Sequence, residues 1–305
     1  MVETYVNEVT LGGCADVYVV DVGLFGLENY GAVYVVDAER PAIIDTGSGK
    51  NHERILEALE LLDIDREEVG YVLPTHVHLD HAGGTGYLAE ACPNATVGIH
   101  RLGARHLSDP GALVEGTKRA VGADKWDYYG EPIPVPDDRI TEFTGGEQLD
   151  LGGETLRVHH APGHAPHQVV FENPENDLVF AADAAGNYFQ ELGFTRALSP
   201  PPDFDLEGCL DDIGTLRSLD PTVLCYAHFG PTVLGEQLDL FEEVLVDWVD
   251  AIAAKRREFE DDDAVVDYFA SRNGVSHIWP ERQAYDGTAM NVRGVLHYLD
   301  GRDET

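Results

Sequence analysis

The sequence has few basic residues. Its 305 residues include 20 lysines and arginines against 56 aspartates and glutamates, which gives a formal net charge of -36. Such a chain repels itself in dilute buffer, whereas the Debye length of about 3 Å in 1 M salt would screen that repulsion. We therefore predict a protein adapted to a salt-rich cytoplasm, as in a halophile. The same scarcity disfavours RNA or another polyanion as a substrate, because phosphate binding depends on lysine and arginine.

Cysteines and long apolar runs are also scarce. Cys14, Cys92, Cys209 and Cys225 are scattered and form no CxxC pair, so the sequence indicates neither a disulfide framework nor a cysteine zinc site. The start, MVETYVNEVT, lacks a basic segment followed by an apolar one, and no apolar run reaches membrane length. We therefore predict a soluble, cytoplasmic protein with no membrane partner.

Short apolar segments typical of strands alternate with segments of helical periodicity. Two blocks of strands, each followed by helices, predict two packed sheets with helices outside. The stretch 107–136 is rich in glycine and proline, and we expect a loop with short helices that shapes a substrate site. The expected strands are 3–11, 15–21, 32–37, 42–45, 70–76, 96–100, 154–160, 168–172, 177–181 and 222–228, and the expected helices are 47–63, 84–91, 206–219, 236–260, 264–270 and 289–299.

The stretch THVHLDHAGG concentrates residues that bind metals. His76, His78, Asp80 and His81 follow directly after the apolar strand YVLPT, so their side chains can converge from one compact turn. Imidazole nitrogens and carboxylate oxygens are ligands of zinc and other first-row metals. Any one of these histidines alone would be interpreted as an ordinary surface or core residue. The four together predict a metal site.

The pattern HxHxDH after an apolar strand resembles the metallo-β-lactamase superfamily. Further motifs match in the order that this family shows: AIIDTGSG with Asp45, APGHAPHQ with His164, VFAADAAG with Asp183 and CYAHFG with His228. The resemblance implies an αββα four-layer sandwich over residues 1–232. It leaves 233–305 as a helical C-terminal extension packed on that domain.

The resemblance also implies a set of metal ligands and their chemistry. A hydroxide shared by two zinc ions would attack a polarised carbonyl or phosphorus, because coordination lowers the pKa of water from about 15.7 to about 7. One ion would stabilise the oxyanion that develops. Asp80 would also orient the nucleophile, and Asp45 would support the site without binding metal. The implied ligands are His76, His78 and His164 for the first ion, Asp80, His81 and His228 for the second, and Asp183 as the bridge.

A complete ligand set indicates a metal-dependent hydrolase that is similar to hydroxyacylglutathione hydrolase (glyoxalase II) and acts on a small thioester or ester. Several alternatives stay open. A mononuclear iron persulfide dioxygenase keeps the same ligands, so Fe2+ is the alternative metal. A lactonase, a phosphodiesterase or nuclease of the same fold, or a binding protein without turnover are further alternatives. His78 stands where the di-iron flavoprotein relatives carry a glutamate, which disfavours that branch.

Other residues are weaker candidates. His167 could face the substrate or support a ligand, and an exposed polar role is the alternative. Tyr188 could donate a hydrogen bond to a substrate carbonyl, as a tyrosine does in similar lactonases. We expect specificity to reside in 107–136, in 187–205 and in the helical tail, which could bring His277 to a wall of the site. The tail could also pack on a second chain and form a homodimer.

Overall fold

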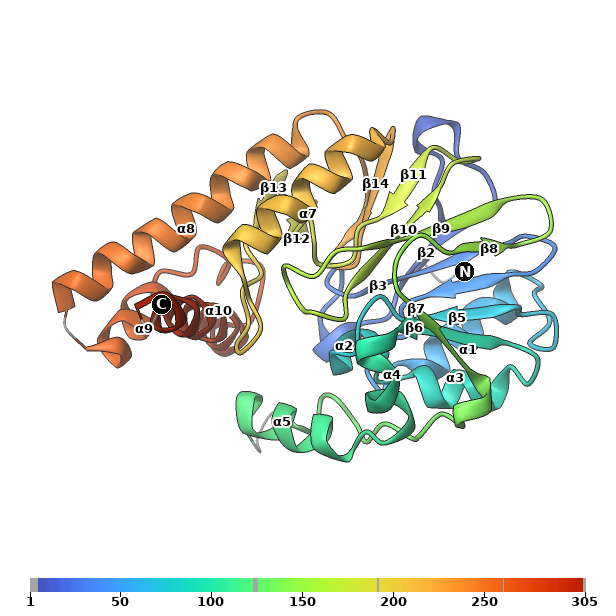
Figure 1. The fold of residues 1–305 in the computed structure, drawn as a ribbon, viewed down its shortest axis with the longest axis horizontal. Helices are drawn as coiled ribbons and strands as arrows, with labels where there is room; N and C mark the ends of the chain where they lie inside the picture. The colour runs from blue at the N-terminus through green and yellow to red at the C-terminus, as the bar shows by residue number, and fades with distance from the viewer. Residues whose placement is uncertain (1–4, 123–125, 191, 260, 304–305) are drawn as a thin grey trace.

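A computed structural model of the chain describes residues 5–122, 126–190, 192–259 and 261–303. Two β-sheets face each other, and helices cover the outer face of each sheet (Figure 1). This arrangement confirms the αββα sandwich. Within the described ranges, no helix combines the length and the apolar character that crossing a membrane requires.

The first sheet has seven strands in chain order. Its first four strands are antiparallel, and the later ones run parallel because helices connect them. Ile55 and Leu59 on the first helix are fully buried in the core on the outer face of this sheet. The strands are β1 (Val6–Glu8), β2 (Val17–Asp21), β3 (Ala32–Val36), β4 (Ala42–Ile44), β5 (Tyr71–Leu73), β6 (Thr96–His100) and β7 (Ile140–Phe143), and the helices that follow β4, β5 and β6 are α1 (His52–Leu61), α2 (Leu79–Ala82), α3 (Thr85–Ala91), α4 (Arg101–Ser108) and α5 (Gly111–Val121).

The second sheet has six strands in the order β15-β14-β11-β10-β9-β8, with β11 and β14 parallel. A separate hairpin pairs β12 with β13. Three-residue 3-10 helices occur at Leu11–Gly13, Leu24–Gly26 and Asp137–Arg139. The remaining elements are β8 (Gln148–Asp150), β9 (Thr155–His160), β10 (Val169–Asn173), β11 (Leu178–Phe180), β12 (Asn187–Phe189), β13 (Phe194–Arg196), α7 (Leu206–Leu219), β14 (Val223–Tyr226), β15 (Gly230–Val233), α8 (Gln237–Phe259), α9 (Asp262–Ala270) and α10 (Glu281–Asp303).

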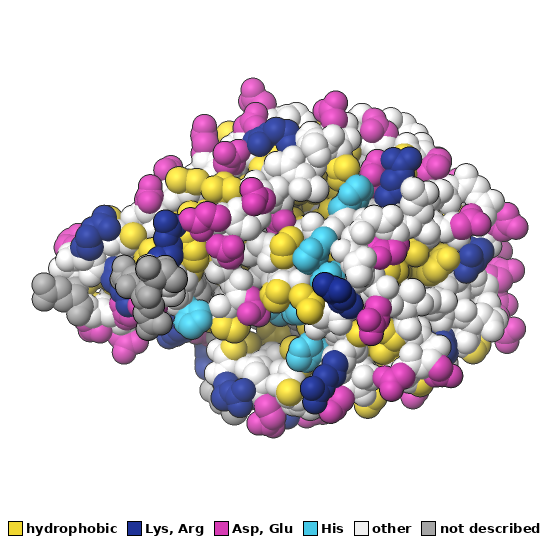
Figure 2. All heavy atoms as spheres, in the orientation of Figure 1, with side chains coloured by type: hydrophobic (Ala, Val, Ile, Leu, Met, Phe, Trp, Pro, Cys, Tyr) yellow, Lys and Arg dark blue, Asp and Glu magenta, His cyan; other side chains and the backbone are white. Residues whose placement is uncertain are grey.

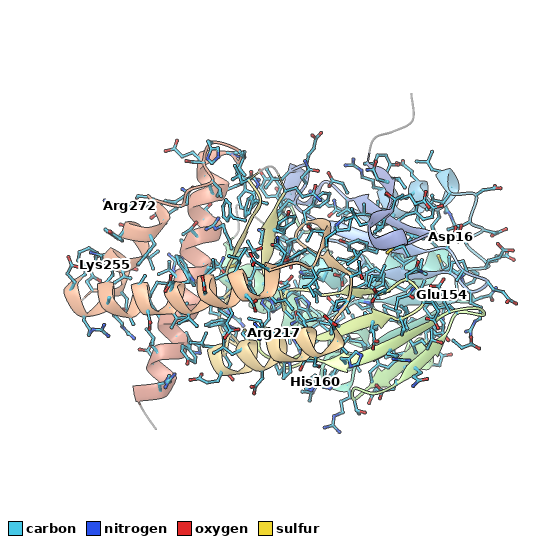
Figure 3. All side chains as sticks on the ribbon, turned by 90° about the horizontal axis from the view of Figure 1, so that it is seen from above. Asp16, Glu154, His160, Arg217, Lys255 and Arg272 are labelled. Carbon is cyan, nitrogen blue, oxygen red and sulfur yellow. The ribbon has the colours of Figure 1, made fainter. Side chains whose placement is uncertain are left out.

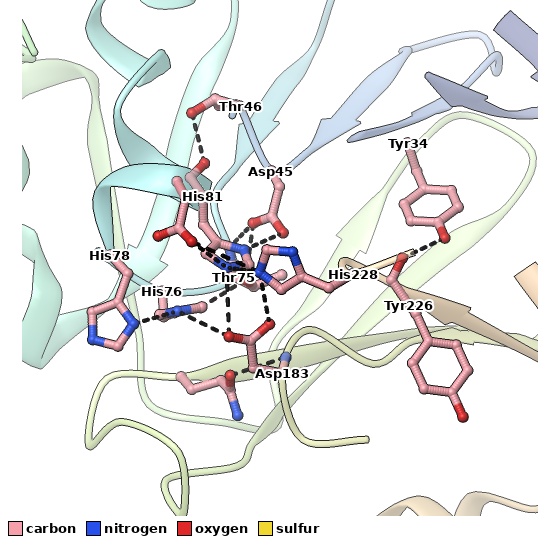
Figure 4. Close-up of polar contacts among 12 residues, drawn as sticks. Tyr34, Asp45, Thr46, Thr75, His76, His78, His81, Asp183, Tyr226 and His228 are labelled. Atoms are coloured by element: carbon pink, nitrogen blue, oxygen red, sulfur yellow. Dashed lines mark hydrogen bonds and ion pairs between the residues drawn. The ribbon is translucent and has the colours of Figure 1, made fainter. Parts of the chain in front are cut away.

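The space between the two sheets is filled by large apolar side chains. Tyr34, Phe143, Phe171 and Phe180 are almost completely buried there. Full burial of a phenylalanine side chain contributes about 1.5–3 kcal/mol. The Tyr34 hydroxyl donates to the carbonyl of Tyr226 at 2.7 Å and so ties the two sheets together near their common edge (Figure 4).

The C-terminal helices pack on the second sheet and share a core with α7. Phe241 and Leu245 of α8 and Val292 and Val295 of α10 are buried in the same cluster as α7 side chains. Asp261 caps α9 by accepting from the Asp263 amide, as an acidic residue at this position should. The division into a domain of residues 1–232 and an extension of residues 233–305 stays a prediction, and residues 1–4 and 304–305 lie outside the described ranges.

Charged side chains cover the outside. Acidic side chains are spread over the whole face in Figure 2, while basic ones are few. Figure 3 places Asp16 and Glu154 at the sheet end of the molecule and Lys255 and Arg272 at the end of the C-terminal helices. The acidity predicted from composition is therefore a property of the surface rather than of one tail.

Several expected boundaries need correction. The expected strand 3–11 is only Val6–Glu8 in the described part, and residues 3 and 4 of that range are not described. The segment 107–136, expected as a loop with short helices, does contain a helix, the eleven-residue α5, and its residues 123–125 lie outside the description. The strands β7, β8, β12, β13 and β15 were not expected. These strands have three or four residues that mix apolar and polar side chains, whereas the short strands that were expected, β4, β5 and β11, are wholly apolar.

Candidate metal centre

The predicted ligands meet at one edge of the sandwich. Parallel strands end at the same edge of a sheet, and residues that follow such strands face one crevice. Asp45 follows β4 and the His76–His81 turn follows β5, while Asp183 follows β11 and His228 follows β14. His164 follows β9, which runs in the same direction as β11 because both are antiparallel to β10.

The distances fit a pair of metal ions. Three overlapping groups have ligand atoms within 4.8 Å of one another. Tetrahedral zinc with bonds of about 2.0–2.1 Å separates neighbouring ligand atoms by roughly 3.3 Å. The ligand atoms here lie at such separations: His76 Nε2 is 2.9 Å from His78 Nδ1, His164 Nε2 is 3.1 Å from the same atom, and His228 Nε2 is 3.2 Å from His81 Nε2. The groups are His76, His78 and His164; His76, His81 and Asp183; and Asp80, His81 and His228.

Asp183 lies between the two halves of the cluster, as a bridging ligand must. Its Oδ2 is 3.2 Å from His164 Nε2. The same oxygen is 3.5 Å from His81 Nε2, and Oδ1 is 3.7 Å from His228 Nε2 (Figure 4). Oδ1 is buried and accepts no hydrogen bond from any described residue. A buried carboxylate oxygen without a donor is costly, and a cation would satisfy it. The donor set and this oxygen therefore fit a dinuclear metal site.

Hydrogen bonds on the outer side of the rings fix which nitrogen faces the cluster. Asp45 Oδ2 accepts from His81 Nδ1 at 2.9 Å, and the carbonyl of Tyr30 accepts from His228 Nδ1 at 2.9 Å. The Thr75 hydroxyl donates to Asp45 Oδ1 at 2.8 Å and can accept from His76 Nδ1 at 3.1 Å. Each of these histidines therefore presents an unprotonated Nε2 to a metal, as the partners of metal-binding histidines generally ensure.

The electrostatics of the cluster also favour cations. Burial, with the neighbouring rings, lowers the pKa of His76 well below its ordinary value and lowers that of His78 to about 3. Both rings are thus neutral and able to bind metal. Burial alone would raise the pKa of Asp183, but the facing histidines His81, His164 and His228 hold it well below its usual range. Burial lowers the pKa of His81, yet the carboxylates around it, Asp183 foremost, raise it well above the ordinary value, so a metal ion bound there would displace the proton from Nε2.

Small residues let the ligand loops pack closely. A side chain on Gly83 would place its Cβ 2.3 Å from the Leu79 carbonyl, and one on Gly84 would come within 2.3 Å of the Thr46 carbonyl. The Asp45 loop therefore lies directly on the turn that carries His81. On the other side, a Cβ on Gly163 would lie 2.1 Å from the backbone nitrogen of Cys209 on α7.

A cavity of about 350 Å³ opens above the cluster. All three regions expected to hold specificity contribute to its walls. Leu113 and Val121 come from α5, Asn187 and Pro200–Asp203 come from the expected 187–205 region, and Met290 comes from α10. The floor is formed by the ligands His78, Asp80, His164, Asp183 and His228.

The weaker candidates have different outcomes. His167 lines the cavity, and its Nδ1 accepts from the Val77 amide at 3.4 Å. Burial lowers its pKa to about 2, so the ring is neutral. Tyr188 does not face the cavity as predicted. Its ring stacks on Tyr226 with centroids 5.1 Å apart and packs against the apolar cluster that contains the side chains of α7, α8 and α10. Strand alternation turns Asn187 toward the cavity and therefore turns Tyr188 away.

Sequence reasoning missed three residues of the site. Tyr30 lines the cavity and stacks on the His228 ring with centroids 4.9 Å apart, and Trp279 packs edge-on against Tyr30 at 4.7 Å. Arg196 also lines the cavity. His277 is not among the lining residues described, although Trp279 from the same segment is. None of the three belongs to a motif, but Arg196 lies in the specificity region 187–205 and Trp279 lies in the helical tail, so only Tyr30 was outside the regions that the sequence indicated.

Comparison with known proteins agrees with this geometry. A family profile described as the metallo-beta-lactamase superfamily matches residues 26–228. The metallo-beta-lactamase fold-containing protein ST1585 from Sulfurisphaera tokodaii is 26% identical over 231 residues, which cover 74% of this chain and 84% of that protein. Hydroxyacylglutathione hydrolase GloC from Haemophilus influenzae is 28% identical over 203 residues, which cover 66% of this chain and 85% of that protein. The crystal structure of ST1585 matches with a TM-score of 0.68 at 22% identity, covering 93% of this chain and 99% of that one.

Proposed function

The chain belongs to the metallo-beta-lactamase superfamily, and from that premise we propose that it is a zinc-dependent hydrolase of small thioesters or esters, similar to glyoxalase II. The observation that carries the proposal is the overlap of three ligand groups around Asp183 at the floor of a cavity. The similarity to a hydroxyacylglutathione hydrolase supports hydrolysis as the reaction. A cavity of about 350 Å³ suits a small molecule rather than a polymer.

Different residues of the site would have different roles in such a reaction. Two bound zinc ions would lower the pKa of a bound water to about 7. Their positive charge would also stabilise the oxyanion that forms from the substrate carbonyl. Asp80 is the most suitable residue to orient that water, because its side chain is 21% exposed and lines the cavity, while Asp183 is 4% exposed. Asp45, Thr75 and the Tyr30 carbonyl keep the histidine rings in one tautomer.

Neutral imidazoles, two carboxylates and no thiolate at the site suit zinc and also suit iron. Metal content must therefore be measured together with activity. We expect close to two zinc ions per chain and hydrolysis of a chromogenic thioester. Bound iron with oxygen uptake and sulfite formation from a persulfide would establish the dioxygenase alternative instead, and cleavage of a phosphodiester or lactone alone would change the substrate class.

Two substitutions test the assignment of the site. The combined changes His76→Ala and Asp183→Ala should abolish hydrolysis, because His76 belongs to two ligand groups and Asp183 lies between the two halves of the cluster. His52→Ala is a matched control, since His52 stacks on Tyr87 at 4.0 Å on the outer helices and belongs to none of the three groups. Full activity in the double variant would remove these residues from the mechanism.

A further inference from the structure

A basic side chain lines the cavity above the metal centre. Among the described residues, Arg196 at the end of β13 is the single lysine or arginine in the cavity wall. It stands out because the chain carries 56 acidic residues against 20 basic ones. A single basic side chain in the cavity of so acidic a protein suggests that the cavity binds a negatively charged group.

Arg196 has no carboxylate partner within the described ranges. Its guanidinium donates to the neutral Thr288 hydroxyl on α10 at 2.9 Å, and no ion pair reaches it from a described aspartate or glutamate. Arg217 shows the contrast, because it contacts both Asp239 and Glu242 at 2.7 Å on the outer surface (Figure 3). The guanidinium has five N–H donors, so Thr288 leaves most of its capacity for a ligand.

The backbone places Arg196 close to the metal ligands. Asn187 is the direct partner of Arg196 in the β12–β13 hairpin, and the same Asn187 bridges to His228 on its other side. Since adjacent strands lie about 4.8 Å apart, the Cα atoms of Arg196 and His228 are roughly 10 Å apart. Directly opposed residues share one face of a hairpin, so Arg196 faces the cavity with Asn187.

No described carboxylate near Arg196 is available to neutralise its positive charge. Burial lowers the pKa of Arg196, but a guanidinium stays protonated in proteins. The cavity carboxylates Asp80 and Asp183 belong to the metal ligands, and Asp203 is exposed at the end of the proline-rich segment. Buried cations are stable when paired, and an anionic ligand in the cavity would pair this one.

We propose that Arg196 binds a fixed negative charge of the substrate, so that the substrate is an anionic thioester or ester with a carboxylate a few bonds from the bond that is cleaved. This inference rests on the proposed function and names the substrate class for the same site. The apolar wall formed by Leu113, Val121 and Met290 would contact the rest of the molecule. Arg196 is then the residue that sets specificity, and it takes no part in activating water.

A binding experiment tests the role of Arg196 without requiring turnover. The probes are 3-mercaptopropionate and 3-mercaptopropionamide, which share a metal-binding thiol and differ in the carboxylate. Calorimetric titration of the zinc-loaded protein should show tighter binding of the acid. In Arg196→Met the ratio of the two affinities should fall about 10- to 100-fold, the range expected for a hydrogen bond to a charged group.

Two further variants make the result interpretable. Arg217→Met removes a surface arginine and should keep the wild-type ratio, which controls for net charge. Arg196→Lys keeps the charge but loses the planar fork, and it should retain part of the preference and the fold if Arg196→Met proves unstable. An affinity ratio that is the same in the wild type, Arg196→Met and Arg196→Lys would overturn the proposal.

Hydrolysis separates this proposal from the proposed function. With a succinyl thioester and the matching succinamoyl thioester, Arg196→Met should lower kcat/KM for the acid alone. A wild type that cleaves neither compound but binds the acidic probe through Arg196 would refute the hydrolase and support the anion site. Equal loss for both thioesters in Arg196→Met, with an unchanged affinity ratio, would refute the anion site and leave the hydrolase intact.

Discussion

The loop that carries His164 is held by a buried carboxyl group, and this contact makes a quantitative prediction. Asp212 on α7 is 2% exposed, and its Oδ2 accepts from the Gly163 amide at 2.7 Å. Burial raises the pKa of Asp212 to about 7. Asp212→Asn keeps the shape and an oxygen that can accept from Gly163, but it cannot ionise.

The direction and size of the effect follow from linkage. In the unfolded chain an aspartate has a pKa of about 3.9, so the folded protein binds this proton more tightly. Stability contributed by protonated Asp212 is therefore present at low pH and is lost as the pH rises from about 4 through about 7. Between pH 5 and pH 8 the wild type should lose about 2.5 kcal/mol of unfolding free energy that Asp212→Asn does not lose.

Urea unfolding at several pH values measures this difference directly. The titrations are done with EDTA and constant high salt, so that metal release and screening are the same for all variants. Asp211→Asn is the matched control, because it removes the same charge from the exposed neighbour on α7. The wild type and Asp211→Asn should both lose stability as the pH rises, with a smaller loss in Asp211→Asn because the charge of Asp211 also raises the pKa of Asp212. If Asp212→Asn follows the same course as both, the carboxyl group is not buried in its protonated form and the reasoning fails.

Three other predictions concern the site and the surface. Asp45→Asn should weaken zinc binding about 10- to 100-fold in a chelator competition. The asparagine NH2 would donate to His81 Nδ1, so the proton of the His81 ring would move to Nε2, which faces the metal. Unchanged affinity would contradict this role of Asp45. Tyr30→Phe should lower kcat about 10-fold with zinc content unchanged, because it removes a hydroxyl from the cavity but keeps the carbonyl that holds His228; loss of zinc in this variant would show that the ring itself supports the ligand. The melting temperature should rise steeply between low and molar KCl because the net charge is -36, and a melting temperature insensitive to KCl would refute an adaptation to high salt.

The ligand cluster was predictable because its residues occur in motifs that follow strands. The apolar run before His76 and the one before Asp183 are long enough to identify as strands, and the edge at which they end then follows from their direction. The hairpin that presents Arg196 was not predictable, because β12 and β13 are short segments that mix polar and apolar residues, whereas β5 and β11 are wholly apolar. Without the register of that hairpin, the sequence cannot distinguish Asn187 from Tyr188, and one residue of error moves a side chain to the opposite face.

The same contrast explains why the metal ligands and the residues that would select the substrate lie in different parts of this chain. The ligands need only the carboxyl ends of strands that the two sheets hold in place, so they lie in short motifs next to small residues such as Gly83 and Gly84. The cavity walls come from α5, from the segment between β11 and α7, and from α10. These segments are joined to the sheets, but the positions of the strands do not determine which side chains they present to the cavity. A substitution in these walls, such as one at Met290, can alter which molecule fits without changing a metal ligand. The recognition of a substrate therefore depends on packing between distant segments, and the sequence alone does not show that Asn187 lies between Arg196 and His228.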